Sequence, residues 1–327
     1  MLNNMQPIFL ISLPRSGSTL LQKILTLSSE IHSVPEPWLM LPFAYMFKEG
    51  EMLTRYGHRT FQYAIEDFVQ HLPNGKSDFY QSLNSFALDL YRKTCPESNA
   101  RFFIDKTPRY YLIIPFLAEV FPNAKFIFLF RNPLEVLASI LTTWSDNRFY
   151  IHNNYIDLFG GPFALAEGAR RYCDRAISVH YGDMVRNPET EIQKICNYIG
   201  IKYAPSMFKD YGGVNLTGTM GDHHGINEFN RVSTDSLEKW KTVLVTRYRK
   251  KFAKKYVHRL GDEVLGAFNT STDSLLADIS SISHNQSGSF LDAFDHSLST
   301  AMRLLGKEHF RQLWRGIGDK KTFFPYY

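Results

Sequence analysis

The stretch IFLISLPRSGST, residues 8–19, combines a buried strand, a tight turn and the start of a helix. Residues 8–13 are a short, β-prone apolar run between Pro7 and Pro14, which is typical of a strand covered on both faces. Apolar residues then recur at helical spacing over residues 20–27. A turn between such a strand and helix directs backbone N–H groups, and the positive end of the helix dipole, at one point. The stretch therefore predicts a binding site for a phosphate or sulfate group.

The side chains of this turn are those that an anion requires. Gly17 allows close approach to the backbone, Arg15 supplies a fixed charge, and Ser16, Ser18 and Thr19 offer hydroxyl donors. The turn is not a Walker A motif, because the cation precedes the glycine and the pattern G-x-x-x-x-G-K-[ST] is absent. The alternative interpretation is a helix N-cap rich in Ser and Thr.

The following chain repeats the strand–helix alternation. Apolar runs predict further buried strands, and amphipathic patterns predict the helices between them. The expected strands are residues 125–130 and 177–181, and the expected helices are residues 111–120, 133–144 and 188–199, the last closing at Gly200. Parallel strands joined by helices predict an α/β fold, a central parallel sheet flanked by helices. Residues 36–95 are less regular, and we expect an insertion between the first two strands that takes part in acceptor recognition.

The C-terminal third differs in composition. Residues 268–290 are rich in Ser, Thr and Asn and predict a mobile linker. Beyond it lies an apolar stripe at helical spacing, formed by Leu291, Phe294, Leu298, Met302 and Leu305. We expect the stripe to dock onto the core rather than to bind a partner. The predicted organisation is one α/β domain over residues 1–267, the linker, and a helical extension over residues 291–327.

Composition excludes several classes of protein. With 44% hydrophobic and 21% charged residues, the chain of 327 residues is expected to be globular. A net charge of 37 − 32 = +5 is too mild for a dedicated nucleic-acid binder but is compatible with an anionic ligand. No run reaches about 18 apolar residues and no signal peptide is recognisable, so we expect a soluble protein without a transmembrane segment. Cys95, Cys173 and Cys196 are odd in number and widely spaced, which predicts buried free thiols in a reducing, cytoplasmic compartment.

A second cation lies where an anion is expected. Arg131 directly follows the predicted strand at residues 125–130, and Ser139 lies eight residues later on the next helix. In an open parallel sheet, residues at the carboxyl ends of the strands face the ligand crevice. Arg131 is therefore placed to meet a second anionic group, the alternative being an ordinary surface arginine.

Together these motifs resemble the sulfotransferase superfamily, whose members use 3′-phosphoadenosine 5′-phosphosulfate. The resemblance rests on PRSGST at residues 14–19, on FPNAKF at residues 121–126, and on Arg131 with Ser139. It extends over residues 8–201, with a weaker similarity in SLEKW at residues 236–240. It implies the P-loop NTPase-like sulfotransferase fold of this superfamily.

The resemblance also implies the roles of the nucleotide-binding residues. Arg15, Ser16, Gly17, Ser18 and Thr19 would hold the 5′-phosphosulfate, and Arg131 and Ser139 the 3′-phosphate. Tyr181, in a His-Tyr-Gly-Asp stretch similar to the family's Arg-Tyr-Glu-Asp, would line the nucleotide site together with Lys239.

Sulfuryl transfer needs a hydroxyl in line with the leaving phosphate, an acceptor for its proton, and positive charge on the leaving oxygen. Glu36 lies 21 residues after Arg15, a distance similar to that of the general base in tyrosylprotein-type sulfotransferases. Lys106, in Asp-Lys-Thr-Pro, resembles the family lysine that faces the leaving group. The resemblance thus implies catalysis by Glu36 as base, with Lys106 and Arg15 stabilising the developing charge.

Two departures bear on the acceptor. Tyrosylprotein enzymes carry cations where this chain has Trp38 and Thr143, so the pattern is closer to bacterial-type relatives than to an enzyme for protein tyrosine. We expect a hydroxyl on a small molecule, lipid or carbohydrate.

Histidines offer a different base and a different kind of site. Cytosolic members of the superfamily use a histidine base, but none of the candidates stands in a matching context; they are His32, His152, His223 and His224. The vicinal pair His223-His224 lacks a third ligand at suitable spacing, so no metal is expected. Two alternatives stay open: a P-loop kinase of a small metabolite, and a non-catalytic module that binds an anionic nucleotide.

Overall fold

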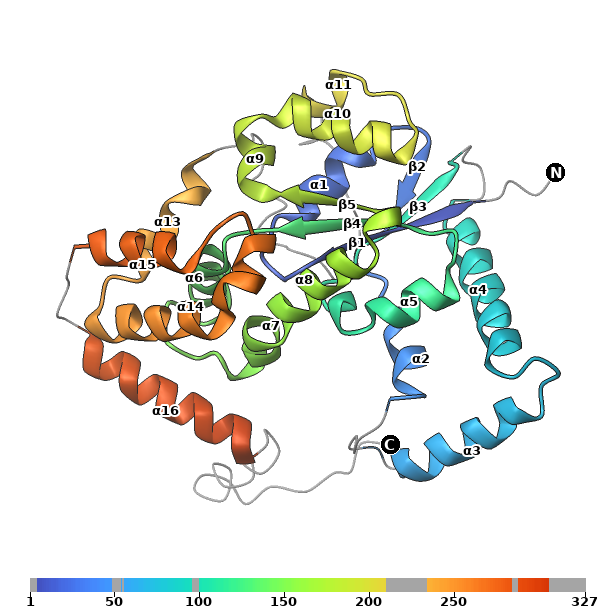
Figure 1. Cartoon of the computed structure of the whole chain (residues 1–327), viewed down its shortest axis with the longest axis horizontal. Coiled ribbons are helices and arrows are strands. Elements are labelled where there is room, and N and C mark those ends of the chain that lie inside the picture. Colours follow the sequence, from blue (N-terminus) through green and yellow to red (C-terminus); the bar gives the residue numbers. More distant parts are fainter. Residues whose placement is uncertain are drawn as a thin grey trace, which may run out of the picture.

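The computed structural model describes residues 5–48, 54, 56–95, 100–209, 234–283 and 288–305 (Figure 1). Five parallel strands form one sheet in the order β2-β3-β1-β4-β5. The strands are β1 (Gln6–Ser12), β2 (Ile31–Ser33), β3 (Phe102–Asp105), β4 (Lys125–Phe130) and β5 (Ala176–His180). The predicted α/β fold with a central parallel sheet is confirmed.

Strand β1 is the centre of the sheet. Its Ile8 lies opposite Ile104 of β3 on one side and Lys125 of β4 on the other. Successive β1 residues point to opposite faces: Ile8 and Leu10 join one apolar cluster, and Phe9 and Ile11 join the other. Burial on both faces explains why residues 8–13 form an apolar run without polar alternation.

Helices cover both faces of the sheet (Figure 1). One face is covered by α1 (Ser18–Leu25), α9 (Tyr181–Arg186) and α10 (Pro188–Ile199). The other is covered by α4 (Lys76–Lys93), α5 (Ile114–Val120), α6 (Pro133–Trp144) and α8 (Gly161–Arg171). Helix α3 (His58–Gln70) precedes α4 in the chain. The shorter helices are α2 (Leu41–Tyr45), α7 (Tyr155–Phe159) and α11 (Ser206–Lys209), and there are 3-10 turns at Tyr110–Leu112, His152–Asn154, Cys173–Arg175 and Thr234–Leu237.

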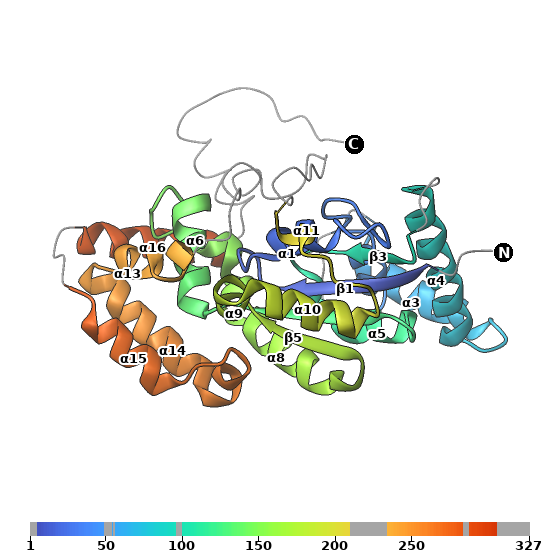
Figure 2. The same cartoon turned by 90° about the horizontal axis from the view of Figure 1, so that it is seen from above.

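The C-terminal helices gather at the end of the molecule away from α3 and α4 (Figure 2). They are α13 (Lys239–Val243), α14 (Arg247–Ala267), α15 (Thr272–Ser281) and α16 (Ser289–Leu305). The prediction of a mobile linker over residues 268–290 is therefore wrong for residues 272–281, which form α15. Ser271 caps α15 by accepting a hydrogen bond from the Ser274 N–H, and the buried side chains of this helix pack in the core, so its Ser and Thr residues form the cap and outer face of a helix.

Strands β2 and β3 were not predicted. The segment at residues 36–95 lies between β1 and β4, the first two predicted strands, and within that interval it follows β2 and precedes β3. Strand β2 has three residues, too few for a periodic signal, and β3 runs directly into the charged Asp105-Lys106 pair. By contrast, β4, α6 and α10 have the predicted bounds, and α10 ends at Gly200 with a left-handed φ of 87°.

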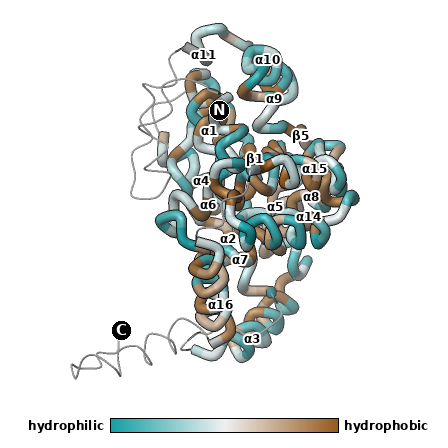
Figure 3. Tube along the Cα trace, turned by 90° about the vertical axis from the view of Figure 1, so that its left-hand side faces the viewer, coloured by the Kyte–Doolittle hydropathy of each residue, from teal (hydrophilic) through white to brown (hydrophobic). Residues whose placement is uncertain are grey.

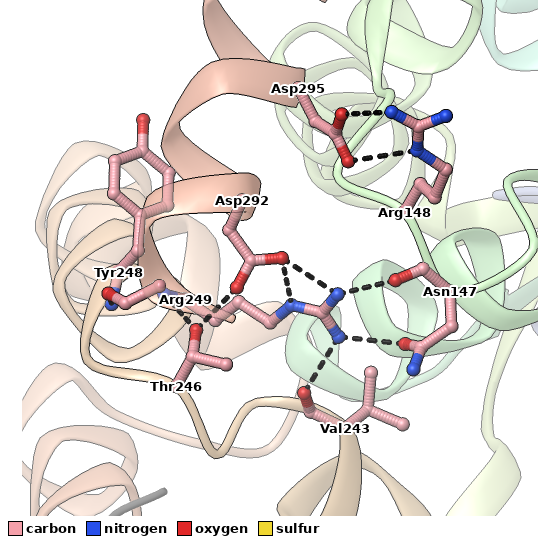
Figure 4. A network of polar contacts seen from close by, with 9 residues as sticks. Asn147, Arg148, Val243, Thr246, Tyr248, Arg249, Asp292 and Asp295 are labelled. Carbon is pink, nitrogen blue, oxygen red and sulfur yellow. Dashed lines mark hydrogen bonds and ion pairs between the residues drawn. The ribbon is translucent and has the colours of Figure 1, made fainter. Parts of the chain in front are cut away.

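Helix α16 binds the rest of the chain through its polar face, so the expected docking of its apolar stripe is wrong. Asp292 and Asp295 are buried, whereas Phe294 of the stripe is 55% exposed. Figure 3 shows the apolar residues of α16 in brown. Figure 4 shows the reason: Asp295 accepts two hydrogen bonds from Arg148, and Asp292 pairs with the buried Arg249. The buried Arg249 is paired by Asp292, and the buried Asp295 is paired by Arg148, so these two ion pairs turn the polar face of α16 inward.

Arg249 also holds the turn that follows α6. Its guanidinium donates to both the side-chain and the backbone oxygen of Asn147 (Figure 4). Asn147 has a left-handed φ of 58°, and Asp292 in turn holds the guanidinium. The C-terminal helices therefore support the end of α6, the helix that carries Ser139.

Candidate active site

The carboxyl ends of all five strands lead to residues that the sequence singled out. The turn after β1 carries Arg15 to Thr19, and the segments after β2, β3, β4 and β5 carry Glu36, Lys106, Arg131 and Tyr181 respectively. Because the strands are parallel, these residues lie along one edge of the sheet. The strand order puts Glu36 and Lys106 on one side of the turn, and Arg131 and Tyr181 on the other.

The turn after β1 has two residues in left-handed conformation, Arg15 with φ 65° and Gly17 with φ 89°. Helix α1 begins at Ser18 and has no side-chain hydrogen bond at its N-cap, so its first N–H groups are left to another partner. The Ser16 hydroxyl is buried and has no hydrogen-bond partner among the described residues. Buried hydroxyl groups are nearly always hydrogen-bonded, so these donors fit a bound oxyanion.

Gly17 is required by its neighbour as well as by its backbone angle. A Cβ atom at this position would overlap the ring of Tyr181. The Tyr181 ring also lies 4.3 Å from the guanidinium carbon of Arg131, in a cation–π contact. Tyr181 therefore packs between the turn and the second predicted anion-binding cation.

Arg131 is held by three partners. Its Nε donates to the Glu135 carboxylate at 2.7 Å, Nη1 to the carbonyl oxygen of Arg15 at 2.9 Å, and Nη2 to the carbonyl oxygen of Ser236 at 3.2 Å. Burial raises the pKa of Glu135, and the charge of Arg131 opposes that shift. Arg131 thus stabilises the left-handed backbone of Arg15 by donating to its carbonyl oxygen. Its position at the end of β4 also suits a bound anion.

Ser139 contacts the turn directly. The Nε of Arg15 donates to the Ser139 hydroxyl at 3.2 Å, and the Arg15 guanidinium lies 5.7 Å from the ring centre of Trp144. Both partners belong to α6, so the helix after β4 positions the arginine that precedes α1. The residues expected at the two anionic ends of the nucleotide are in contact in this structure.

Glu36 and Lys106 form a buried ion pair. The Nζ of Lys106 lies 2.9 Å from Oε1 of Glu36, and the two side chains are 2% and 12% exposed. The same Nζ donates to the Thr19 hydroxyl at 3.4 Å. The other carboxylate oxygen of Glu36 accepts a hydrogen bond from Nε1 of Trp38 at 3.3 Å. A carboxylate and an ammonium group thus lie side by side next to the turn after β1.

Asp105 directly precedes Lys106 and is a fully buried carboxylate, to which the sequence motifs assign no role. Its oxygens accept hydrogen bonds from the hydroxyl groups of Tyr91 at 2.6 Å, Tyr110 at 2.9 Å and Thr107 at 3.2 Å. Burial raises the pKa of Asp105 to about 6, against the opposing effect of these hydrogen bonds.

The segment at residues 236–240 reaches the site through Ser236. The hydroxyl groups of Ser236 and Tyr181 lie 3.0 Å apart, and the Ser236 carbonyl oxygen accepts from Arg131. Lys239, the residue expected to act here, has an exposed side chain at the start of α13. The sequence feature that could have indicated Ser236 is therefore its position in SLEKW, the segment with weak similarity to the family.

The candidate histidine bases lie in several places. His32 of β2 packs against Phe103, with ring centres 5.9 Å apart. His152 contacts Ser299 of α16. His223 and His224 lie outside the described residues.

Other expectations concern metals, membranes and thiols. In the ranges that the structure covers, no group of three or more His, Cys, Asp or Glu side chains is arranged to hold a metal ion. No helix in the described part of the chain has the length and apolar character needed to cross a bilayer. The three cysteines are free, but only Cys196 is buried: Cys95 is partly exposed and Cys173 is exposed, unlike the expected set of buried thiols.

The chain is similar to proteins of one family. The sequence profile of the "Sulfotransferase family" matches residues 7–205, more than half of the 327 residues. Nodulation protein NoeE of Sinorhizobium fredii is 29% identical over an alignment of 270 residues, and the match covers 72% of this chain and 60% of the relative. The chain thus spans about 60% of that relative's length. A putative protein-tyrosine sulfotransferase of Caenorhabditis briggsae is 24% identical over 73% of this chain and 82% of the relative.

Solved structures with similarity include two sulfotransferase domains. The domain from the Synechococcus PCC 7002 olefin synthase has a TM-score of 0.48 and 26% identity, covering 73% of this chain and 88% of that domain. The domain from the curacin biosynthetic pathway has a TM-score of 0.46 and 21% identity, covering 77% of this chain and 97% of that domain.

Proposed function

The chain belongs to the sulfotransferase family, and from this premise we propose that it transfers a sulfuryl group from 3′-phosphoadenosine 5′-phosphosulfate to a hydroxyl acceptor. The observation that carries the proposal is the contact of Lys106 with both Glu36 and Thr19. It joins a base and a cation to the loop that suits the anionic end of the donor.

The residues around the turn fit the donor nucleotide. The Ser16 hydroxyl, which has no partner in the described part of the chain, suits the 5′ end, as do the uncapped start of α1 and the charge of Arg15. Arg131 and Ser139 suit the 3′-phosphate, and the Tyr181 ring offers an aromatic wall beside them. When bound, the donor supplies an activated sulfuryl group on a phosphate leaving group.

The chain's own residues supply the proton acceptor and the countercharge. The Glu36 carboxylate takes the proton of the attacking hydroxyl as the acceptor oxygen bonds to sulfur. The Lys106 ammonium and the Arg15 guanidinium stabilise the charge that develops as the bond from sulfur to the bridging oxygen breaks. Adenosine 3′,5′-bisphosphate is then the second product.

The acceptor is proposed to be a hydroxyl on a small molecule, lipid or carbohydrate. One relative is named as acting on protein tyrosine, but Trp38 stands here where tyrosylprotein enzymes carry an arginine.

We propose a location in the cytoplasm, and the three free cysteines support a reducing compartment.

Ligand-dependent unfolding followed by a transfer screen tests the proposal. Adenosine 3′,5′-bisphosphate at about 100 times its Kd is expected to raise the stability of the native state by about 2.7 kcal/mol. ATP with and without Mg²⁺ serves as the comparison, because a P-loop kinase would respond to ATP·Mg²⁺. Transfer of labelled sulfate to a panel of phenols, sugars and lipids then identifies the acceptor class.

Two outcomes would overturn the proposal. No response to the bisphosphate would exclude the nucleotide site, and binding without transfer to any hydroxyl would indicate a non-catalytic module.

A Ser16→Ala variant is expected to lose affinity for the bisphosphate without losing stability in the absence of this ligand, since the Ser16 hydroxyl has no described protein partner. Ser85→Ala on the exposed side of α4 is the matched control.

A further inference from the structure

Two hydroxyl groups hold the backbone of the segment that carries Glu36. The N–H of Trp38 donates to the Thr107 hydroxyl at 3.2 Å. The N–H of Met40 donates to the Tyr110 hydroxyl at 3.1 Å. We call residues 36–40 the base loop. The loop is thus fixed at two backbone positions by side chains that follow β3.

Both hydroxyl groups donate onward to the same carboxylate. Thr107 donates to Oδ1 of Asp105 at 3.2 Å, and Tyr110 donates to Oδ2 at 2.9 Å. Asp105 has no exposed surface and directly precedes Lys106, the ion-pair partner of Glu36. One buried carboxylate therefore holds the base loop through two bridges and lies next to the lysine that contacts the base.

The backbone conformation of Trp38 depends on these bridges and affects the orientation of the Glu36 carboxylate. Trp38 has a left-handed φ of 55°, a conformation that is strained for a bulky residue and persists only where the surroundings impose it. In this conformation its indole N–H donates to Oε2 of Glu36, while Lys106 holds Oε1. The orientation of the carboxylate is thus set by two donors, one of which depends on the constrained backbone.

We propose that Asp105 is a positioning residue for Glu36, acting through the hydroxyl groups of Thr107 and Tyr110 on the base loop. The inference rests on the proposed role of Glu36 as base. Displacing a catalytic group by about 1 Å can cost 10²-fold in rate. Loss of either bridge is therefore expected to lower turnover while leaving nucleotide binding intact, because the turn after β1 makes neither bond.

Single variants remove one bridge at a time. Thr107→Val and Tyr110→Phe delete the hydroxyl with little change in shape, and Thr107→Ser keeps it. Tyr91→Phe is the matched comparison, since Tyr91 donates to Asp105 at 2.6 Å but its hydroxyl does not bridge to the described base loop. Tyr256→Phe controls for loss of a buried hydroxyl elsewhere, because that group donates to the Leu158 carbonyl oxygen.

Three readouts separate positioning from folding. Turnover is measured as release of adenosine 3′,5′-bisphosphate from the sulfate donor, with the acceptor found in the screen and with water. Affinity is measured by calorimetry with the bisphosphate. Hydrogen–deuterium exchange of the base loop reports the two backbone N–H bonds directly.

Thr107→Val and Tyr110→Phe are expected to lower kcat by about 10-fold or more, with unchanged bisphosphate affinity and faster exchange in the base loop. Thr107→Ser is expected to restore turnover, and Tyr91→Phe to leave the exchange of the loop unchanged. Wild-type kcat in both bridge variants, or equal losses in Tyr256→Phe, would overturn the inference. An inactive wild-type protein would instead contradict the proposed function, so the two failures are distinguishable.

Discussion

The ammonium group of Lys106 lies 2.9 Å from Oε1 of Glu36 and 3.4 Å from the hydroxyl of Thr19. One buried cation therefore connects the candidate base with the predicted anion-binding turn. The pair also compensates two charges that would be costly to bury alone. A donor in the turn and a hydroxyl beside Glu36 would meet at this lysine.

Replacing Glu36 with glutamine tests the base. Gln retains an oxygen for the Lys106 ammonium but cannot take a proton, so turnover is expected to fall by about 10²-fold or more. Affinity for adenosine 3′,5′-bisphosphate, measured by calorimetry, is expected to stay within about threefold of wild type, that is within about 0.7 kcal/mol. Glu167→Gln, on the exposed surface of α8, is the control. Wild-type turnover in Glu36→Gln would remove this residue from the mechanism.

Alanine at Gly17 is expected to damage both folding and binding. A left-handed φ of 89° and the overlap with the Tyr181 ring both oppose a Cβ atom there. Chemical unfolding is expected to show a loss on the order of 2 kcal/mol, and stabilisation by the bisphosphate is expected to disappear. Gly266→Ala, inside α14 where a Cβ meets no atom within 4 Å, is expected to be neutral or stabilising. Equal behaviour of the two variants would contradict this account.

Arg131→Lys tests recognition of the 3′-phosphate. Three guanidinium N–H groups of Arg131 donate to Glu135, Arg15 and Ser236, and the remaining N–H groups are proposed to donate to the 3′-phosphate. Lysine cannot make both sets of directed contacts, so affinity for the bisphosphate is expected to fall by about 10- to 100-fold. The loss for 5′-AMP, which lacks the 3′-phosphate, is expected to be about 10-fold smaller, since each hydrogen bond to a charged group contributes about 1.5–3 kcal/mol. Both Kd values come from calorimetry, with Arg170→Lys as an exposed control. Equal losses for the two nucleotides would assign Arg131 a purely structural role.

The pKa of Asp105 predicts a pH dependence of stability. Burial raises the pKa of this carboxyl from 3.8 to about 6, so the folded chain holds its proton at a pH where the unfolded chain has lost it. The stabilising contribution is complete below about pH 4 and is lost as the pH rises through about 6. Relative to Asp105→Asn, the wild-type free energy of unfolding is expected to fall by on the order of 3 kcal/mol between these limits. Denaturant titrations at several pH values measure it, and parallel curves for the two proteins would refute it.

The orientation of α16 predicts that protein stability depends more on its buried aspartates than on its apolar residues. Asp292→Ala leaves the buried Arg249 without its carboxylate and is expected to cost about 3–5 kcal/mol. Phe294→Gln changes an exposed side chain and is expected to cost less than about 0.5 kcal/mol. Denaturant unfolding of both variants provides the comparison. A larger loss for the phenylalanine variant would mean that the apolar face of α16 turns inward.

The strand β1, its turn, the helix α6 and the strand ends that bear Arg131 and Tyr181 were predictable from local patterns. An apolar run predicts a buried parallel strand. A glycine and hydroxyl residues within a few positions of one another predict a phosphate-binding turn. Candidate roles for Glu36 and Lys106 came from resemblance to a family. That they form an ion pair could not be read from residues 70 positions apart.

The sequence by itself determined the parallel α/β class, the strands β1, β4 and β5, and the position of the turn after β1, because periodicity and turn chemistry are properties of neighbouring residues. Only the tertiary structure decided how the base is held and which face of α16 is buried. The bridge from Trp38 to Thr107 spans 69 positions, and that from Met40 to Tyr110 spans 70. For α16, the charges of Arg148 and Arg249, distant in sequence, outweighed its own apolar stripe. Where buried polar groups must find partners, the partner's location decides the packing, and no local pattern records it.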